Sequence, residues 1–321
     1  MKRLIILSVL FFGVFDSLVI CPSFIYAEEY PAKEVLTKEQ ALLKKIEQLT
    51  GAKGEYIAKE NVYKVGFPRS DIKLDISGVK MAPAMGLGVW ASFKISGNVT
   101  MVMGDTVMTE DQVNPVMSAA LDNGLEVTAI HNHFFWDYPK IMFMHIGGMG
   151  DTGLSGLETL AVAVGKVFVK IKETSGGKGE KPYAEIDPSK TTLDPKKIED
   201  VLGVKGQFSN GVYKITIGRT ASMHSVEVGN AMGINTWAAF AGSDDKAVVD
   251  GDFVMLEEEV QPVLKALRRA GINIVALHNH MMMESPRMMF LHFWGIGSTT
   301  GLAQGLKAAL DTQQKKEKHR R

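Results

Sequence analysis

The chain has 321 residues, of which 45% are hydrophobic and 22% charged, and its formal net charge is zero. This length and composition suit a globular protein of about two ordinary domains and exclude an intrinsically disordered chain. Because there is no excess of basic residues, nothing indicates a nucleic-acid partner or bulk attraction to anionic lipid.

The N-terminus is typical of an export signal. Met1-Lys2-Arg3 is a short basic start, and the apolar run Leu4 to Phe15 is too short to span a bilayer comfortably. Ile25-Tyr26-Ala27 offers a cleavage site. We therefore expect residues 1–27 to be a signal peptide and the mature protein to be exported, to the periplasm or the cell surface.

The single cysteine, Cys21, suggests an alternative to simple cleavage. A lipoprotein signal would end there, and an acylated Cys21 would be the only route by which the sequence connects this protein to a membrane. If cleavage follows Ala27, the mature chain has no cysteine. Any metal site must then use His, Asp, Glu or Met side chains.

Residues 28–171 are predicted to form a first repeat with alternating strands and helices. The periodicity of the apolar residues and the turn residues between them set its boundaries. The expected elements are a helix over 37–49, strands over 62–67, 89–95 and 99–103, a capped helix over 109–123, strands over 125–130 and 141–146, and a helix over 154–164.

Residues 172–193, rich in Gly, Lys, Ser and Pro, are predicted to be a linker to a second repeat over 194–321. The same elements are expected again: a helix from 194 to 202, strands over 212–217, 225–228, 236–241 and 246–249, a helix over 257–270, strands over 272–277 and 288–293, and a helix over 300–310.

The fold class expected from this order is α+β. The central part of each copy reads strand, strand, helix, strand, strand, helix, which a circular permutation of a ferredoxin-like unit produces. The fold is then a tandem duplication of a permuted ferredoxin-like ββαββα unit. The alternative is a two-cupin β-barrel protein, because His-x-His-x3-Asp/Glu is the core of the cupin metal motif.

The strongest sign of duplication is a histidine element that occurs twice. The segment from His131 to His145 returns as His278 to His292 at a constant offset of 147 residues. Three histidines, one acid, one proline and one cation keep their places. The histidines are His131, His133 and His145, and His278, His280 and His292.

These histidines are candidate metal ligands. Side chains two residues apart on a strand share a face, so each His-x-His pair points to one side. Asp137 and Glu284, four residues beyond His133 and His280, are the candidate catalytic acids, as ligand or general base for metal-bound water. Zinc is the first choice of metal, with copper or iron as alternatives. A purely structural histidine network is the competing interpretation.

A Gly-Asp pair precedes the second helix of each copy, as Gly104-Asp105 and Gly251-Asp252. The pair is equally compatible with a strand-to-helix turn and with a role in the site.

The sequence also resembles the LppY/LpqO-type family of exported bacterial proteins of unknown function. The resemblance is carried by Gly104-Asp105, Val113-Asn114-Pro115-Val116, Gly124 to His133 and Pro139 to His145, together with their copies. It covers nearly the whole mature chain. It implies an exported or lipid-anchored protein and no particular reaction.

The sequence therefore predicts an exported two-repeat protein with a His-rich site for a metal or a small molecule in each repeat, or one composite site. Two functions remain open. One is a metal-dependent hydrolase, and the other is a periplasmic metal carrier that binds zinc or copper without catalysis. An open coordination position would favour the enzyme, and a closed set of ligands would favour the carrier.

Overall fold

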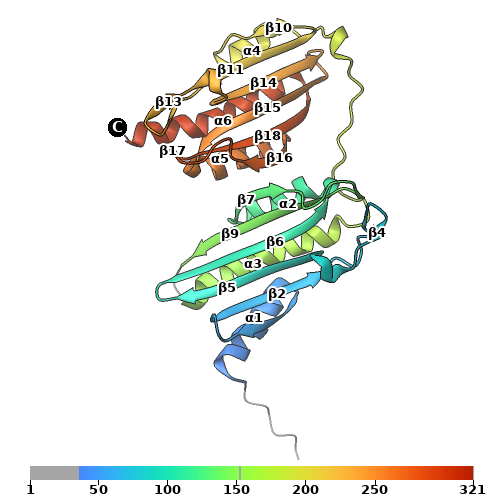
Figure 1. The fold of residues 1–321 in the computed structure, drawn as a ribbon, viewed down its shortest axis with the longest axis vertical. Helices are drawn as coiled ribbons and strands as arrows, with labels where there is room; N and C mark the ends of the chain where they lie inside the picture. Colours follow the sequence, from blue (N-terminus) through green and yellow to red (C-terminus); the bar gives the residue numbers. More distant parts are fainter. Residues whose placement is uncertain (1–35, 152, 321) are drawn as a thin grey trace, which may run out of the picture. The chain divides into compact units, whose positions relative to one another are not determined.

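The computed structural model describes residues 36–151 and 153–320, with side chains as far as residue 313. The expected signal peptide and Cys21 lie outside the described residues. Residues 37–321 form one compact unit of α+β structure (Figure 1). Within the described part of the chain, no helix combines the length and the apolar character needed to cross a membrane.

The first repeat begins with a helix and then builds six strands of the main sheet. Its elements are α1 (Lys38–Thr50), β1 (Lys53–Ile57), β2 (Val62–Pro68), β3 (Asp75–Ile76), β4 (Val79–Lys80), the 3-10 turn η1 (Pro83–Met85), β5 (Gly88–Ser96), β6 (Val99–Thr109), α2 (Glu110–Asp122), β7 (Glu126–His131), β8 (Asp137–Tyr138), β9 (Ile141–Gly150) and α3 (Gly153–Glu173).

The second repeat has the same strands and α-helices in the same order, with an additional 3-10 turn before its second helix. After the turn η2 (Pro188–Lys190), they are α4 (Pro195–Leu202), β10 (Gln207–Ser209), β11 (Val212–Gly218), β12 (Ala221–Met223), β13 (Val226–Val228), η3 (Asn230–Met232), β14 (Asn235–Gly242), β15 (Ala247–Leu256), η4 (Glu257–Glu259), α5 (Val260–Arg269), β16 (Asn273–His278), β17 (Glu284–Ser285), β18 (Met288–Gly297) and α6 (Thr299–Arg320).

One antiparallel sheet of twelve strands contains six strands from each repeat. Its order is β1-β2-β5-β6-β9-β7-β16-β18-β15-β14-β11-β10. The second half of this order is the first half in reverse, as expected for a duplicated unit. The sheet ends in two edge strands, β1 and β10, so it is open, and the alternative of two closed cupin barrels is wrong.

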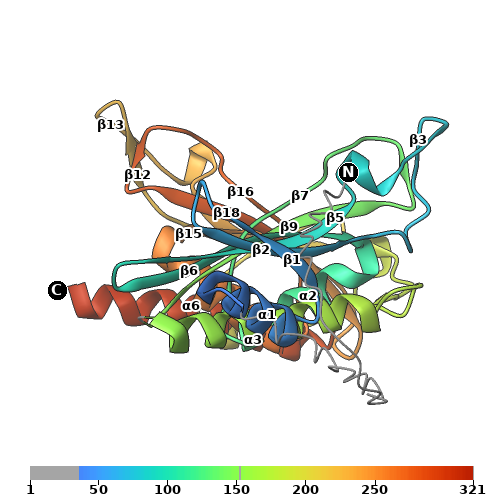
Figure 2. The ribbon, with the colours of Figure 1, turned by 90° about the horizontal axis from the view of Figure 1, so that it is seen from below.

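The helices lie on one face of this sheet and leave the other face open (Figure 2). The alternation of side chains along β6 shows the two environments. Val102 and Thr106 are buried beneath the helices, whereas Met103, between them, is 61% exposed on the open face. Residues with the parity of Met103 can therefore form a surface site.

Two small three-stranded sheets rise beside the open face (Figure 2). Their strand orders are β4-β3-β8 and β13-β12-β17. In the first, Ile76 pairs with Asp137, and in the second Met223 pairs with Glu284. The loops that follow the histidine pairs are thus tied to hairpins from the first part of each repeat.

The two repeats meet through β7 and β16, which pair antiparallel at Ile130 and Leu277. Two equivalent side chains lock this seam. The Asn114 amide accepts from the Ile274 N–H (2.8 Å) and donates to the Ile274 carbonyl (3.1 Å). Gln261, 147 residues later, makes the same two bonds to Val127, at 3.0 and 2.9 Å.

These bonds explain an irregularity in each inner strand. Pairing with the neighbouring strand shifts register just after Val127 and just after Ile274. A β-bulge takes backbone groups out of the ladder. At both bulges a side-chain amide from the opposite repeat bonds the backbone N–H and carbonyl. Neither Val127 nor Ile274 is therefore left with an unbonded backbone group in the seam.

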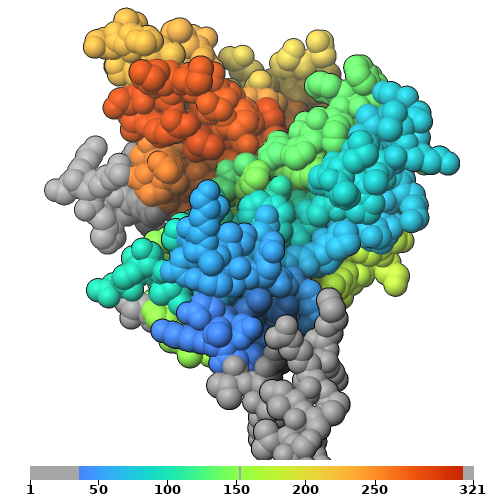
Figure 3. Space-filling model, turned by 60° about the horizontal axis from the view of Figure 1, so that its bottom comes forward, coloured from blue at the N-terminus to red at the C-terminus, as the bar shows by residue number. Residues whose placement is uncertain are grey.

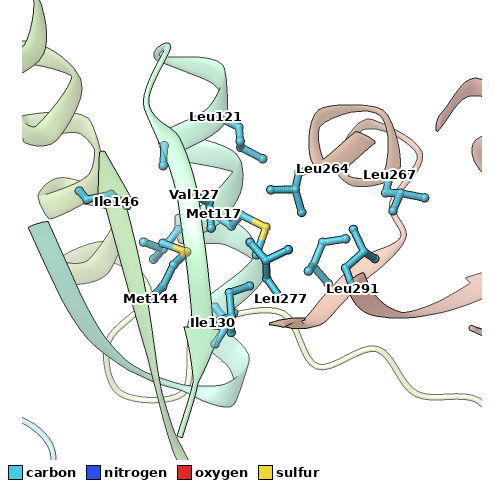
Figure 4. Close-up of a cluster of buried hydrophobic side chains, with 14 of the residues drawn as sticks. Met117, Leu121, Val127, Ile130, Met144, Ile146, Leu264, Leu267, Leu277 and Leu291 are labelled. Atoms are coloured by element: carbon cyan, nitrogen blue, oxygen red, sulfur yellow. The ribbon is translucent and has the colours of Figure 1, made fainter. Parts of the chain in front are cut away.

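Apolar side chains from both repeats fill the seam beneath the sheet (Figure 4). Met117 and Leu121 of α2 lie across from Leu264 and Leu267 of α5, and all four are buried. In the space-filling view, segments coloured blue to green and orange to red meet along a common boundary (Figure 3). The repeats therefore share one continuous core.

Candidate functional site

The three histidines of each copy gather on the open face of the sheet. The rings of His131 and His133 are stacked, with centroids 5.1 Å apart, and His145 of β9 stacks on His131 at 5.2 Å. In repeat 2 the corresponding separations are 5.1 Å for His278–His280 and 4.6 Å for His278–His292.

The bulge in the inner strand brings the third histidine into place. Because the register shifts by one residue after Val127, His145 pairs with Ala129 and shares the face of His131. The same shift pairs His292 with Ala276. The sequence alone left the reach of this histidine open, because it depended on a loop and a bulge with no clear signature.

An aromatic ring supports the second histidine of each pair. His133 stacks on Phe143 with centroids 3.4 Å apart, and His280 stacks on Phe290 at 3.5 Å. Both phenylalanines are buried, so they hold a fixed platform under the imidazole. This contact orients the ring before any ligand arrives.

The acid beside the histidines comes from the neighbouring strand. Asp105 lies opposite His145 in the β6–β9 register, and Asp252 lies opposite His292 in β15–β18. In repeat 2, Asp252 Oδ2 is 3.1 Å from His280 Nε2. Burial raises the pKa of Asp105, and the adjacent histidines lower it by a smaller amount, so the net shift is upward.

Gly104-Asp105 and Gly251-Asp252 lie inside strands, so the expectation of a strand-to-helix turn is wrong. The glycine is required by packing on the helix side. A Cβ added at Gly251 would come within 2.2 Å of the Phe293 ring and 2.4 Å of the Trp237 carbonyl. In each Gly-Asp pair, the glycine thus allows close packing on the helix side of the sheet, and the aspartate places a carboxylate on the open face.

Asp137 and Glu284 make hydrogen bonds within the loop that follows each histidine pair. Asp137 accepts from the Ile141 N–H (2.9 Å) and from Lys140 Nζ (2.8 Å). Burial raises the pKa of Asp137, but these bonds together lower it by a larger amount, so its pKa lies below the ordinary value. Glu284 accepts from the Met288 N–H at 3.1 Å. Both carboxylates close the loop after the histidine pair.

Repeat 2 has the more complete cluster. Asp252, His278 and His280 each offer a ligand atom, and these atoms all lie within 4.8 Å of one another. Asp252 Oδ1 and His278 Nε2 are buried and have no hydrogen-bond partner. Burial also lowers the pKa of His278, which favours the neutral, ligand-competent imidazole. In the described part of repeat 1, no three such groups come equally close.

A pocket of about 330 Å³ adjoins this cluster. Asp252 and His280 form one side of it, and the other walls come from β11, β14 and the loop at η3. The sequence motif could have revealed the acid, because the Gly-Asp pair repeats at the same offset as the histidines. The pocket residues Lys214, Asn230 and Asn235 carried no such signal.

Comparison with known proteins supports the duplication, because both repeats match the same family. Residues 44–165 and 196–312 each match a family described as "Domain of Unknown Function (DUF1259)". No curated protein matches the chain. One solved structure that it resembles is a trimeric bacterial microcompartment shell protein, PduB. The alignment has 10% identity, a TM-score of 0.18, and coverage of 83% of this chain and 92% of that one.

Proposed function

We propose a metal-binding role for this chain, which belongs to the family described as "Domain of Unknown Function (DUF1259)". The site is in repeat 2, where Asp252, His278 and His280 bind a divalent cation. His292 stacks on His278 from the far side and is the fourth candidate ligand. Repeat 1 holds the equivalent residues in a weaker arrangement.

One observation carries the proposal. A buried carboxylate oxygen and a buried imidazole nitrogen, Asp252 Oδ1 and His278 Nε2, have no hydrogen-bond partner. Leaving one such group unbonded costs about 1–3 kcal/mol, and more when it is charged. Two in one cluster are best explained by a ligand that both atoms contact, and a cation suits an anionic oxygen beside neutral nitrogens.

Zinc is the metal that the ligand set favours. Imidazole with carboxylate suits zinc or iron, whereas copper(I) prefers thiolate or thioether sulfur. Met144 and Met288 are buried within hydrophobic clusters, where they fill space. Tetrahedral zinc with bonds of about 2.0–2.1 Å requires ligand separations of roughly 3.3 Å. The ligand atoms lie within 4.8 Å of one another, so any separation wider than this zinc geometry allows must close through side-chain rotation.

The test compares two equivalent double variants. Protein purified without added metal is equilibrated with zinc, dialysed and analysed for bound metal, with thermal unfolding measured on the same samples. The wild type should retain zinc, and changing His278 and His280 to Ala should abolish retention. The matched variant of His131 and His133 should keep the repeat-2 site. A wild type that retains no zinc would refute the proposal.

Metal-dependent hydrolysis is a second candidate function, favoured by the pocket beside the cluster. A cation there would supply a Lewis acid and lower the pKa of a bound water. The zinc-loaded protein should then hydrolyse p-nitrophenyl acetate or p-nitrophenyl phosphate faster than the His278/His280 variant does. Equal rates would leave a carrier role.

We also propose a fold type for the repeat, a family group for the chain and a cellular location for the protein. The strand order β5-β6-β9-β7, with α2 and α3 as the helices, supports a permuted ferredoxin-like unit. The histidine element and its flanks support membership of the LppY/LpqO-type group. The basic start and apolar run of the first 27 residues support export to the periplasm or cell surface.

A further inference from the structure

We infer that the repeat-2 pocket takes a small oxyanion, such as a carboxylate or phosphate group, and holds it between the proposed metal and Lys214. This inference rests on the proposed metal site and adds the class of ligand that the site recognises. It concerns the pocket of about 330 Å³ described above, which is near the lower end of the roughly 300–1,000 Å³ typical of ligand sites.

The walls of this pocket are polar and come from several elements. Besides Asp252 and His280, they are Lys214, Thr216, Asn230, Ala231, Gly233, Asn235 and Trp237. Two amides, a hydroxyl and an ammonium thus line a space that has two residues of the proposed metal site, Asp252 and His280, on one side. Such groups fix the orientation of a polar ligand rather than an apolar one.

Repeat 1 provides an internal comparison. Its equivalent pocket is larger, about 910 Å³, and neither Asp105 nor a histidine lines it. Pro83 and Gly88 stand where repeat 2 has Asn230 and Asn235, 147 residues later. The duplication therefore diverged at the residues that line the pocket, and only repeat 2 combines polar walls with the acid and a histidine.

The charges of the pocket favour an anion only when a metal is present. Lys214 Nζ lies 4.1 Å from the centroid of the Trp237 ring. No carboxylate of the described residues lies within ion-pair distance of it. In the metal-free protein the Asp252 carboxylate repels an anion. A divalent cation reverses that local charge and leaves the cation and Lys214 as two positive centres facing one pocket.

Binding of the metal and the oxyanion should therefore be coupled. If the metal raises the affinity for the anion by some factor, the anion raises the affinity for the metal by the same factor. Removal of the Lys214 charge should weaken anion binding by about tenfold, the usual scale for one charge-assisted hydrogen bond. It should leave the affinity for the metal alone unchanged, because Lys214 is not a ligand.

The experiment is calorimetric titration of acetate and of inorganic phosphate into zinc-loaded and metal-free full-length protein. Lys214→Gln is the test variant. Lys64→Gln is the matched control, because Lys64 sits over Trp90 in repeat 1 as Lys214 does over Trp237 in repeat 2. Zinc affinity is measured for each protein with a competing chelator, with and without the anion.

The inference predicts anion binding to zinc-loaded wild type and to Lys64→Gln, weaker binding to Lys214→Gln, and little or none to metal-free protein. Equal binding with and without zinc, or equal binding to the two variants, would overturn it while the metal site stands. Failure of the wild type to bind zinc in the anion-free titration would instead overturn the proposed function, and this inference with it.

Discussion

Two buried aspartates of this protein differ in how their oxygens are satisfied. Asp137 has both carboxylate oxygens bonded, to Lys140 and to the Ile141 N–H. Asp252 is 3% exposed, and its Oδ1 has no partner. The first arrangement stabilises a loop, whereas the second destabilises the metal-free fold in a way that a ligand can relieve. Sequence spacing pointed to Asp137, and three-dimensional position points to Asp252.

Asp252→Asn should separate these two effects. The substitution keeps the size of the side chain and removes the charge that a cation needs. Zinc affinity should fall by about 100-fold or more, at the upper end of the scale for residues around a metal. Thermal stability without metal should stay the same or rise, because a buried charge with one unbonded oxygen disappears. Chelator competition and calorimetric melting measure the two quantities.

Asp105→Asn is the control, since Asp105 has the same position in repeat 1 and also one unpartnered oxygen. It should leave the repeat-2 affinity unchanged. A large loss of metal-free stability in Asp252→Asn would contradict this account and favour a structural role for the carboxylate.

Asp137→Asn should reduce stability in a pH-dependent way. The folded-state pKa of Asp137 is lowered, so its contribution is present above the unfolded-state pKa and is lost as pH falls through the folded-state pKa. At pH 7 the variant should be less stable by about 1–3 kcal/mol, and the difference should shrink below about pH 4. Urea unfolding at a series of pH values measures it. A difference independent of pH would rule out the charge of Asp137 as the cause.

At the scale of elements, the sequence predicted the features that depend on neighbouring residues, such as helix caps and the faces of strands. The Thr109 N–H donates to Gln112 Oε1 as the capping pattern requires, and α2 starts one residue later. The two histidines of each pair share a face because strand side chains alternate. The tandem duplication and the α+β class followed from the repeats of such elements.

Long-range packing determined the features that the sequence did not predict. The strand expected over 99–103 continues to Thr109, because Gly104 permits close strand packing rather than a turn. The helix expected over 154–164 runs to Glu173, with a buried apolar face through Ile171. No local sequence pattern predicts the central β7–β16 pairing. None predicts the hydrogen bonds of the Asn114 and Gln261 amides across the seam, here called the amide locks, because the partners lie far apart in the sequence.

The amide locks should be important for the stability of the seam. Changing Asn114 or Gln261 to Ala removes two bonds and leaves a backbone N–H and a carbonyl without partners at the opposite bulge. Each variant should lose about 1–3 kcal/mol in urea unfolding. Asn123→Ala is the control, because the Asn123 amide makes one exposed bond within its own helix end. Losses no larger than that of the control would show that the locks are not stabilising.

At the scale of the whole molecule, duplication produced one sheet with two unequal sites. Both copies keep the histidines, the aspartate and the phenylalanine platform. Among the residues that the structure describes, repeat 2 alone brings three ligand atoms within 4.8 Å of one another, and a polar pocket adjoins them. A duplicated unit can conserve its core in both copies while one copy specialises. The sequence revealed the duplication but not the difference between the two sites. That difference depends on where Asn230 and Asn235 lie in the fold, around the same pocket as Asp252.

The expected export of the chain has a direct test on the complete protein. Protein recovered from its native host should have the intact mass of a chain that begins at Glu28. A mass that corresponds to a diacylglyceryl group on Cys21 would establish the lipoprotein alternative. Retention of Met1 would contradict export by a cleaved signal.

The central claim, a metal at the repeat-2 cluster, is tested most directly by anomalous diffraction at the zinc edge from crystals grown with zinc. The account predicts an anomalous peak in contact with Asp252, His278 and His280, whose ligand atoms lie within 4.8 Å of one another without metal and should draw closer around it. Absence of a peak there under saturating zinc, with Asp252 Oδ1 and His278 Nε2 bonded to ordered water instead, would contradict it.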